Sequence, residues 1–86
     1  MFVILTYDIG VKRVAKVMKV CRKYLVHIQK SVFEGDLTDK QLRHLKREIR
    51  NIIDYNHDSV RIYKFGSLKY SSREEIGVNT VNNQIV

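Results

Sequence analysis

The order of strand and helix patterns along the 86 residues constrains the fold of this chain more than any other feature. Residues 2–9, Phe-Val-Ile-Leu-Thr-Tyr-Asp-Ile, form an apolar run typical of a buried strand. After Gly10, apolar residues recur at helical spacing from Lys12 to about Tyr24, with basic residues elsewhere around the helix. The apolar set is Val14, Val17, Met18, Cys21 and Leu25. This segment therefore predicts a strand followed by an amphipathic helix with a basic outer face.

Residues 26–36, Val-His-Ile-Gln-Lys-Ser-Val-Phe-Glu-Gly-Asp, predict two more strands. The segment is rich in β-branched and aromatic residues and alternates roughly with period two. We expect a tight bend near Lys30 and Ser31 to join the strands. Gly35 is expected at a bulge or at a strand end, because glycine inside a strand often marks such a place.

A second amphipathic helix is predicted after Thr38-Asp-Lys-Gln41, which has the form of a capping box. The predicted inward residues are Leu42, Leu45, Ile49, Ile52 and Ile53, and the outward ones are Arg43, Lys46, Arg47 and Arg50. The polar loop 54–58 ends this helix, and residues 59–65 alternate as the last clear strand. Residues 75–78 predict a short edge strand.

The resulting order, β-α-β-β-α-β plus a tail, is that of an α+β ferredoxin-like two-layer sandwich with a C-terminal tail strand. We expect residues 1–86 to form one such domain, with residues 78–86 mobile or docked on a partner subunit. Both helices would cover one face of an antiparallel sheet. Strand residues of both parities are apolar, so the other face would expose apolar side chains in a monomer. We therefore expect a homodimer packed through the sheet faces, with a tail strand that crosses to the partner as one alternative.

The formal net charge of +7 indicates a polyanionic partner. Nucleic acid is the first candidate and an anionic membrane the second, while a small basic protein without such a partner is the remaining alternative. The single cysteine, Cys21, excludes an intramolecular disulfide framework and is expected in the core. No run approaches the ~20 apolar residues that span a bilayer, and the N-terminal apolar run has no basic n-region before it. We expect a cytoplasmic protein without membrane contact.

Asp8 is the only acidic residue among the first 33 positions, which carry seven Lys or Arg residues. A carboxylate at a strand end beside a basic segment suggests a metal ion or an acid/base group that acts on an anionic polymer. Mg²⁺ takes about six oxygens and usually one or two protein carboxylates, so one Asp8 is a poor site. Two copies across a two-fold axis would supply two carboxylates to one ion. The alternative is that Asp8 caps a turn or the first helix.

Several other residues are candidates for the site, and a purely structural role would explain each of them as well. Glu34 and Asp36 share a strand face, which a solvated edge explains as well. His27 could contact a phosphate or donate a proton. Tyr7 and Phe33 could stack on bases, or belong to the core.

Three segments together carry a resemblance to a known family: Tyr7-Asp-Ile9, Lys12-Arg-Val14 and Gln29-Lys-Ser-Val-Phe-Glu-Gly-Asp-Leu37. They resemble the small CRISPR-associated endoribonuclease family, CRISPR-associated protein 2. The second helix, Asp58-Ser-Val-Arg-Ile-Tyr63 and the tail Glu75-Ile-Gly77 are similar to family features, so the likeness covers nearly the whole chain.

The resemblance implies a ferredoxin-like homodimer in which Asp8 binds Mg²⁺ between the subunits. It implies a metal-dependent nuclease of antiviral defence, acting on RNA or duplex DNA, and a partnership with the CRISPR integrase in spacer acquisition. Arg13 and Phe33 match positions implicated in the activity of relatives. His27 stands where relatives often carry Arg, so its charge at a phosphate would depend on pH. The predicted catalytic set is Asp8, Tyr7, Arg13, His27 and Phe33, with Asp8 as the metal ligand.

Two other functions stay open on the same fold: a non-catalytic DNA-binding scaffold of the integration complex and a stand-alone RNA-cleaving toxin. A ferredoxin-like RNA-recognition module is disfavoured. Such modules carry an aromatic signature on the third strand, whereas this chain has Ser31-Val-Phe-Glu-Gly35 there, with an acid where RNA would lie.

Overall fold

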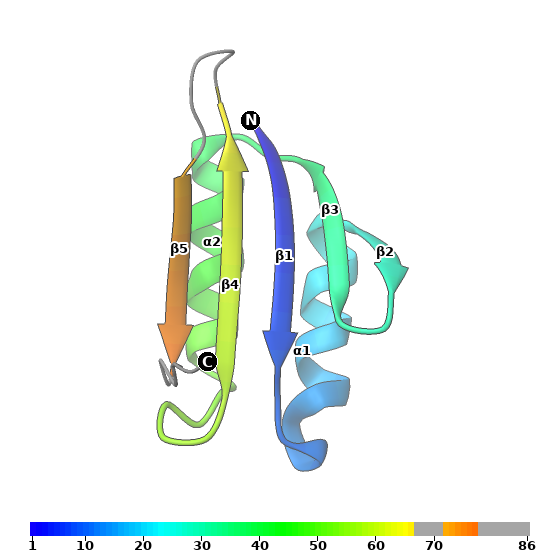
Figure 1. The fold of residues 1–86 in the computed structure, drawn as a ribbon, viewed down its shortest axis with the longest axis vertical. Coiled ribbons are helices and arrows are strands. Elements are labelled where there is room, and N and C mark those ends of the chain that lie inside the picture. The colour runs from blue at the N-terminus through cyan, green and yellow to red at the C-terminus, as the bar shows by residue number, and fades with distance from the viewer. Residues whose placement is uncertain (67–71, 78–86) are drawn as a thin grey trace.

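The chain folds into a five-stranded antiparallel sheet with two helices on one of its faces (Figure 1). The structure is a computed structural model that describes residues 1–66 and 72–77. In chain order the elements are β1 (Phe2–Asp8), α1 (Val11–Tyr24), β2 (Val26–Gln29), β3 (Val32–Asp36), α2 (Asp39–Arg50), β4 (Ser59–Phe65) and β5 (Ser72–Gly77). The predicted element order, including the tail strand, is confirmed. Within the two described ranges, no helix is long and apolar enough to cross a membrane.

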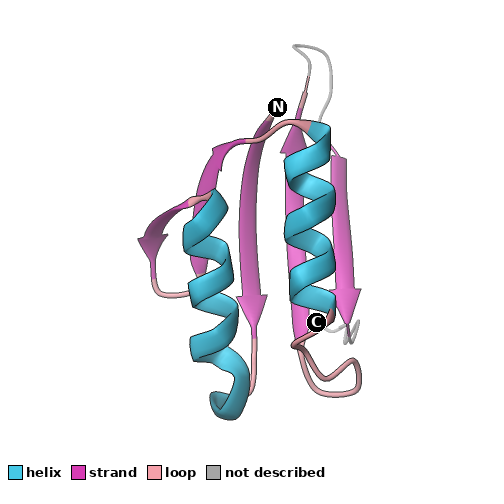
Figure 2. Cartoon of the chain, turned by 180° about the vertical axis from the view of Figure 1, so that it is seen from behind, coloured by secondary structure: helices cyan, strands magenta, loops and turns pink. Residues whose placement is uncertain are grey.

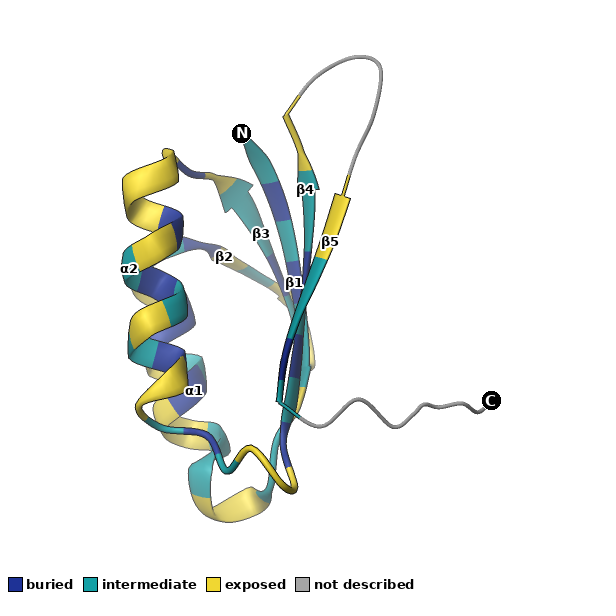
Figure 3. Cartoon of the chain, turned by 90° about the vertical axis from the view of Figure 1, so that its left-hand side faces the viewer, coloured by how far each residue is buried: buried dark blue, intermediate teal, exposed yellow. Residues whose placement is uncertain are grey.

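The strand order across the sheet is β2-β3-β1-β4-β5, with β1 in the centre. Both helices lie on the same face of the sheet, as the view from behind shows (Figure 2). Seen edge-on, the opposite face is covered by no described element (Figure 3). The predicted ferredoxin-like two-layer arrangement is therefore correct, and it leaves one open face of the sheet.

The core lies between the sheet and the helices. Alternate strand residues face the helices because successive side chains of a strand point to opposite faces. Fully buried strand residues are Val3, Leu5, Phe33, Val60 and Ile62, and the helices contribute Val17, Cys21, Leu45 and Ile49. Burial raises the pKa of the Cys21 thiol to about 12, as expected for a residue that packs rather than reacts.

The second helix begins and ends through local hydrogen bonds. Thr38 Oγ1 accepts from the backbone amide of Gln41 at 3.1 Å, and Gln41 Oε1 accepts from the amide of Thr38 at 2.9 Å, so the capping box is confirmed. The helix ends at Arg50, earlier than predicted. Ile52 and Ile53 follow it in a turn, where the Ile52 amide donates to the Ile49 carbonyl at 2.9 Å. The apolar spacing predicted a longer helix because Ile53 is buried in the core although it lies beyond the end of the helix.

The bend between β2 and β3 lies at Lys30 and Ser31, as predicted, and Lys30 takes a positive φ of 35°. The bulge does not lie at Gly35, which sits within the regular pairing of β3 with β1. It lies in β2 between His27 and Gln29. A Cβ at Gly35 would come within 3.2 Å of the Leu25 side chain, so this glycine makes room for packing instead.

The tail strand pairs with β4 of its own chain, over residues 72–77 rather than 75–78. Glu74 holds it by accepting from Lys46 at 2.8 Å and from Lys64 at 2.6 Å. In this single chain the strand therefore completes its own sheet, and the alternative that the tail crosses to a partner subunit stays a prediction. Position 78 and the predicted mobile or docked segment 78–86 lie outside the described residues.

Candidate active site

Asp8 is the last residue of β1, and its side chain is exposed on the open face. Alternation along β1 places Phe2, Ile4 and Thr6 on this same face, opposite the buried Val3 and Leu5. Within residues 1–66 and 72–77, the Asp8 carboxylate makes no salt bridge or side-chain hydrogen bond. Its two oxygens are therefore available to a ligand.

One cation stands close to Asp8 on the open face. Asp8 pairs with Ser59 of β4, and Arg61 follows two residues along the same strand. Arg61 Nε donates to Glu75 Oε2 at 2.8 Å. This hydrogen bond raises the pKa of Arg61, and the nearby Asp8 charge adds to the effect. Arg61 therefore stays positively charged beside the free carboxylate.

Three of the predicted site residues lie on the other side of the sheet, under the helices. Phe33 pairs with the buried Leu5 and with His27, so these residues share the helix-facing side. The His27 ring stacks on Phe33 with centroids 4.5 Å apart, and Tyr7 lies against Phe33 with centroids 6.1 Å apart. The sheet itself separates this row of rings from Asp8.

Burial decides what these rings can do. Phe33 is fully buried, so the alternative that it stacks on bases is wrong for this conformation. His27 Nε2 donates to the Lys30 carbonyl at 2.5 Å, which occupies that nitrogen. Burial raises the pKa of Tyr7, so its phenol stays protonated at neutral pH. The catalytic roles that the resemblance implies for these three residues stay predictions.

Arg13 is engaged with a buried carboxylate that the sequence analysis did not single out. Asp58 is fully buried. Arg13 Nε donates to Asp58 Oδ2 at 2.5 Å, and Arg13 Nη2 donates to Asp58 Oδ1 at 3.0 Å. The backbone amides of Gly10 and Asp54 donate to the same carboxylate, each at 2.9 Å. These donors, led by Arg13, hold the pKa of Asp58 well below its usual range.

The Asp58 network joins two loops that are far apart in the sequence. Gly10 belongs to the loop after β1, and Asp54 to the loop between α2 and β4. A Cβ at Gly10 would lie 2.6 Å from Arg13 Nη2, so glycine allows the guanidinium to close over the loop. The network fixes the chain two residues beyond Asp8.

Glu34 and Asp36 share one face of their strand, as predicted, and it is the open face. Asp36 pairs with Phe2, at the opposite end of β1 from Asp8, and Glu34 pairs with Ile4. These carboxylates therefore do not join Asp8 in a common site. Over the described ranges, no group of three or more His, Cys, Asp or Glu side chains is placed to hold a metal ion.

The donor chemistry at Asp8 suits magnesium, but the number of donors in one chain does not. A free carboxylate is a hard oxygen ligand of the kind that Mg²⁺ takes, and the ion usually uses one or two of them. One chain supplies one. A second copy of Asp8 is the simplest source of another.

The exposed faces of the two helices form a basic surface, here named the basic helix layer. It consists of Lys12, Lys16, Lys19, Arg22, Lys23, Lys40, Arg43, Arg47 and Arg50. In the part of the chain that the structure describes, only Lys23 of this set forms a salt bridge, with Glu48. The remaining charges face solvent and are available to an anionic partner.

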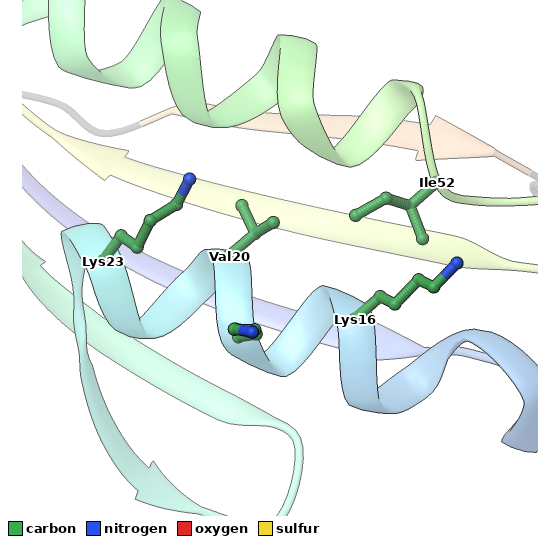
Figure 4. A pocket seen from close by; sticks show the side chains of 5 residues that line it. Lys16, Val20, Lys23 and Ile52 are labelled. Carbon is green, nitrogen blue, oxygen red and sulfur yellow. The ribbon is translucent and has the colours of Figure 1, made fainter.

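A shallow depression of about 270 Å³ lies within the basic helix layer, between α1 and α2 (Figure 4). Lys16, Lys19 and Lys23 surround it, and Val20 and Ile52 add apolar surface. Drug-sized ligands occupy pockets of roughly 300–1,000 Å³, so this depression is small for a cofactor. Lysine stems that lie over apolar residues with their ammonium groups in water account for it.

These features define a class of protein: a basic ferredoxin-like fold with an open sheet face and a free carboxylate at the end of its central strand. Comparison with known proteins then gives the family. The model of the family CRISPR associated protein Cas2 matches residues 1–73, and the chain belongs to this family.

Individual relatives agree with this assignment. The chain is 46% identical over 78 residues to the CRISPR-associated endoribonuclease Cas2 of Thermotoga maritima, covering 91% of this chain and 90% of that protein. It is 45% identical over 78 residues to the protein of the same name from Dictyoglomus turgidum, with the same coverage. The crystal structure of Streptococcus pyogenes Cas2 at pH 6.5 matches with a TM-score of 0.71 and 36% identity, over 77% of this chain and 87% of that one. The predicted family is confirmed.

Proposed function

We propose that this chain is a magnesium-dependent endoribonuclease of CRISPR-based antiviral defence, acting in the cytoplasm as a homodimer. The observation that carries the proposal is the Asp8 carboxylate, which is exposed on an uncovered sheet face and free of protein partners within the described residues. The names of the relatives from Thermotoga maritima and Dictyoglomus turgidum, both called endoribonucleases, support the reaction class.

The open face supports the homodimer. Phe65 is 41% exposed there, and its ring lies against Phe2 with centroids 6.1 Å apart. Ile4 and Tyr63 pair beside them on the same face. Burying apolar surface is favourable by roughly 25 cal/mol per Å², so a second copy placed on this face would stabilise both chains. A two-fold axis through the face repeats Asp8 in the partner.

The residues of each subunit would have separate tasks. The two Asp8 carboxylates would hold the magnesium ion, which when bound neutralises a phosphodiester oxygen and acidifies a water molecule. Arg61, a permanent cation next to Asp8, is placed to attract a phosphate to this end of the sheet. The basic helix layer would hold the rest of the nucleic-acid backbone through phosphate contacts.

The test is cleavage of labelled single-stranded RNA and duplex DNA by wild type, Asp8→Asn and Asp36→Asn, with magnesium and with a chelator. Asp36 is the matched control because it is an exposed carboxylate on the same face, at the far end of β1. We expect Asp8→Asn to lower cleavage at least 100-fold and Asp36→Asn to leave it nearly unchanged. The enzyme proposal would be refuted if Asp8→Asn cleaved at the wild-type rate, or if wild type cleaved equally fast with magnesium and with the chelator.

The basic helix layer favours a second candidate, a DNA-binding scaffold that works beside the CRISPR integrase. Its exposed cations lie on the helices, whereas Asp8 lies on the opposite face of the sheet, so nucleic acid can bind the helices without contacting Asp8. Spacer acquisition in cells that carry Asp8→Asn distinguishes the candidates. Normal acquisition would favour the scaffold. The genes that flank this one would identify a stand-alone toxin.

A further inference from the structure

We propose that Asp58 is a positioning residue for Asp8, and that Arg13 acts through Asp58 rather than on the substrate. Together they would hold the end of β1 in the geometry that metal binding needs. This inference rests on the proposed role of Asp8, and it assigns Arg13 a different task from a direct catalytic one.

The Asp58 carboxylate is fully used by the protein. Oδ1 accepts from the Gly10 amide at 2.9 Å and from Arg13 Nη2 at 3.0 Å. Oδ2 accepts from Arg13 Nε at 2.5 Å and from the Asp54 amide at 2.9 Å. A carboxylate offers about four acceptor positions, and here each oxygen takes two donors. Such saturation suits a fixed structural junction and leaves nothing for a ligand.

This junction lies close to the backbone of Asp8, through the neighbours of Asp8 in the chain and across the sheet. Asp58 immediately precedes Ser59, the residue that pairs with Asp8 across β1 and β4. Gly10, which Asp58 binds, follows Asp8 by two residues. On the other side, a Cβ at Gly77 would lie 2.1 Å from the Asp58 carbonyl oxygen, so β5 also packs closely on this point. Asp58 therefore lies where the ends of β1, β4 and β5 meet, beside the backbone on both sides of the Asp8–Ser59 pair.

The geometry of Arg13 argues against a direct contact with nucleic acid. A guanidinium that recognises phosphate presents its planar fork of donors to the ligand. Arg13 instead directs Nε and Nη2 at Asp58, and only 27% of its side chain is exposed. Its neighbour Lys12 is exposed and, within the described residues, forms no salt bridge, so it is the better candidate for a phosphate contact.

A double-mutant cycle tests the proposal, with Arg13→Gln, Asp58→Asn, the double variant and the control Asp36→Asn, which changes an exposed carboxylate at the far end of β1. Folding is first checked by circular dichroism at the assay temperature. We expect each single variant to lower cleavage at least tenfold and to raise the magnesium concentration at half-maximal activity. The double variant should cleave as fast as the less active of the two single variants, because both changes break the same junction. The proposal would be overturned if the loss of cleavage in the double variant equalled the product of the two single losses.

A second measurement needs no activity: amide hydrogen exchange and NMR signals of the metal-free protein. We expect the Gly10 amide to exchange at least tenfold faster in Arg13→Gln and Asp58→Asn, and the Asp8 amide signal to shift. The control Asp36→Asn should change neither signal. If Asp58→Asn does not fold, Arg13→Gln still tests the idea. In that variant the Gly10 amide keeps the Asp58 carboxylate as its acceptor, but the guanidinium that holds this carboxylate in place is gone. Unchanged Asp8 and Gly10 signals would refute positioning, whereas an inactive wild type would refute the proposed nuclease instead.

Discussion

The two faces of the sheet differ in how complete they are. The helix-covered face is closed by the protein itself, with Leu5, Phe33 and Ile62 fully buried under the helices. The open face carries apolar residues at one end and the free Asp8 carboxylate at the other, with no described element above them. The comparison teaches that stability resides on the covered face, while the open face keeps apolar surface and a free carboxylate for the second copy proposed above.

The largest effect on stability is expected from Phe33→Ala on the covered face. Removing a fully buried phenyl ring costs about 3–5 kcal/mol, a large share of the roughly 5–15 kcal/mol that holds a small domain together. The matched change on the open face, Phe65→Ala, should cost roughly 1 kcal/mol or less at a dilution where the chain is monomeric. Urea unfolding of both variants measures the difference, and equal losses would contradict the distinction between the faces.

Asp58→Asn is expected to be next, at about 3 kcal/mol, because it leaves buried donors without their charged acceptor. The folded-state pKa of Asp58 is lowered, so its contribution to stability is present above about pH 4, where a free carboxyl is already ionised. It is lost as the pH falls further, through the lowered pKa. Wild type should therefore lose stability below pH 4 more steeply than Asp58→Asn, and parallel acid-unfolding profiles would contradict this account.

Phe65→Glu tests the open face through the oligomeric state of the protein rather than through its stability. A charge placed among the open-face apolar residues should convert the proposed dimer to a monomer, while the stability of each chain changes little. Light scattering after size-exclusion chromatography measures the mass. The control Tyr55→Glu changes another aromatic residue that is 50% exposed, in the loop after α2, and should leave the mass unchanged. Dissociation of both variants, or of neither, would show that the open face is not the interface.

The smallest effect is expected from single changes in the basic helix layer. Lys19→Gln should weaken nucleic-acid binding slightly and lower the slope of log affinity against log salt by about one, because one phosphate contact is lost. Filter binding over a range of salt concentrations gives the slope. A slope that Lys19→Gln leaves unchanged would remove this residue from the nucleic-acid surface.

The elements of the fold were predictable because their signals are local. The capping box at Thr38 and the bend at Lys30 both depend on neighbouring residues, and the structure confirms both. The end of α2 was not predictable from apolar spacing, since Ile53 packs into the core from a turn.

The site was only partly predictable. Asp8 is recognisable as a carboxylate at a strand end, but residues 2–9 are apolar on both parities, so the sequence does not show which parity is buried. Adjacent residues of a strand face opposite sides of the sheet. The side chains of Tyr7 and Asp8 therefore lie on different faces, although the two residues are neighbours in the sequence. Asp58 looked like part of a polar loop, because its partner Arg13 lies 45 residues away and only the topology brings them together.

The central claim is that two copies of Asp8 meet on one magnesium ion across the open face. Isothermal titration of the purified protein with magnesium tests it most directly. The account predicts one ion for every two chains, and loss of this binding in Asp8→Asn but not in Asp36→Asn. One ion per chain, or unchanged binding by Asp8→Asn, would contradict it.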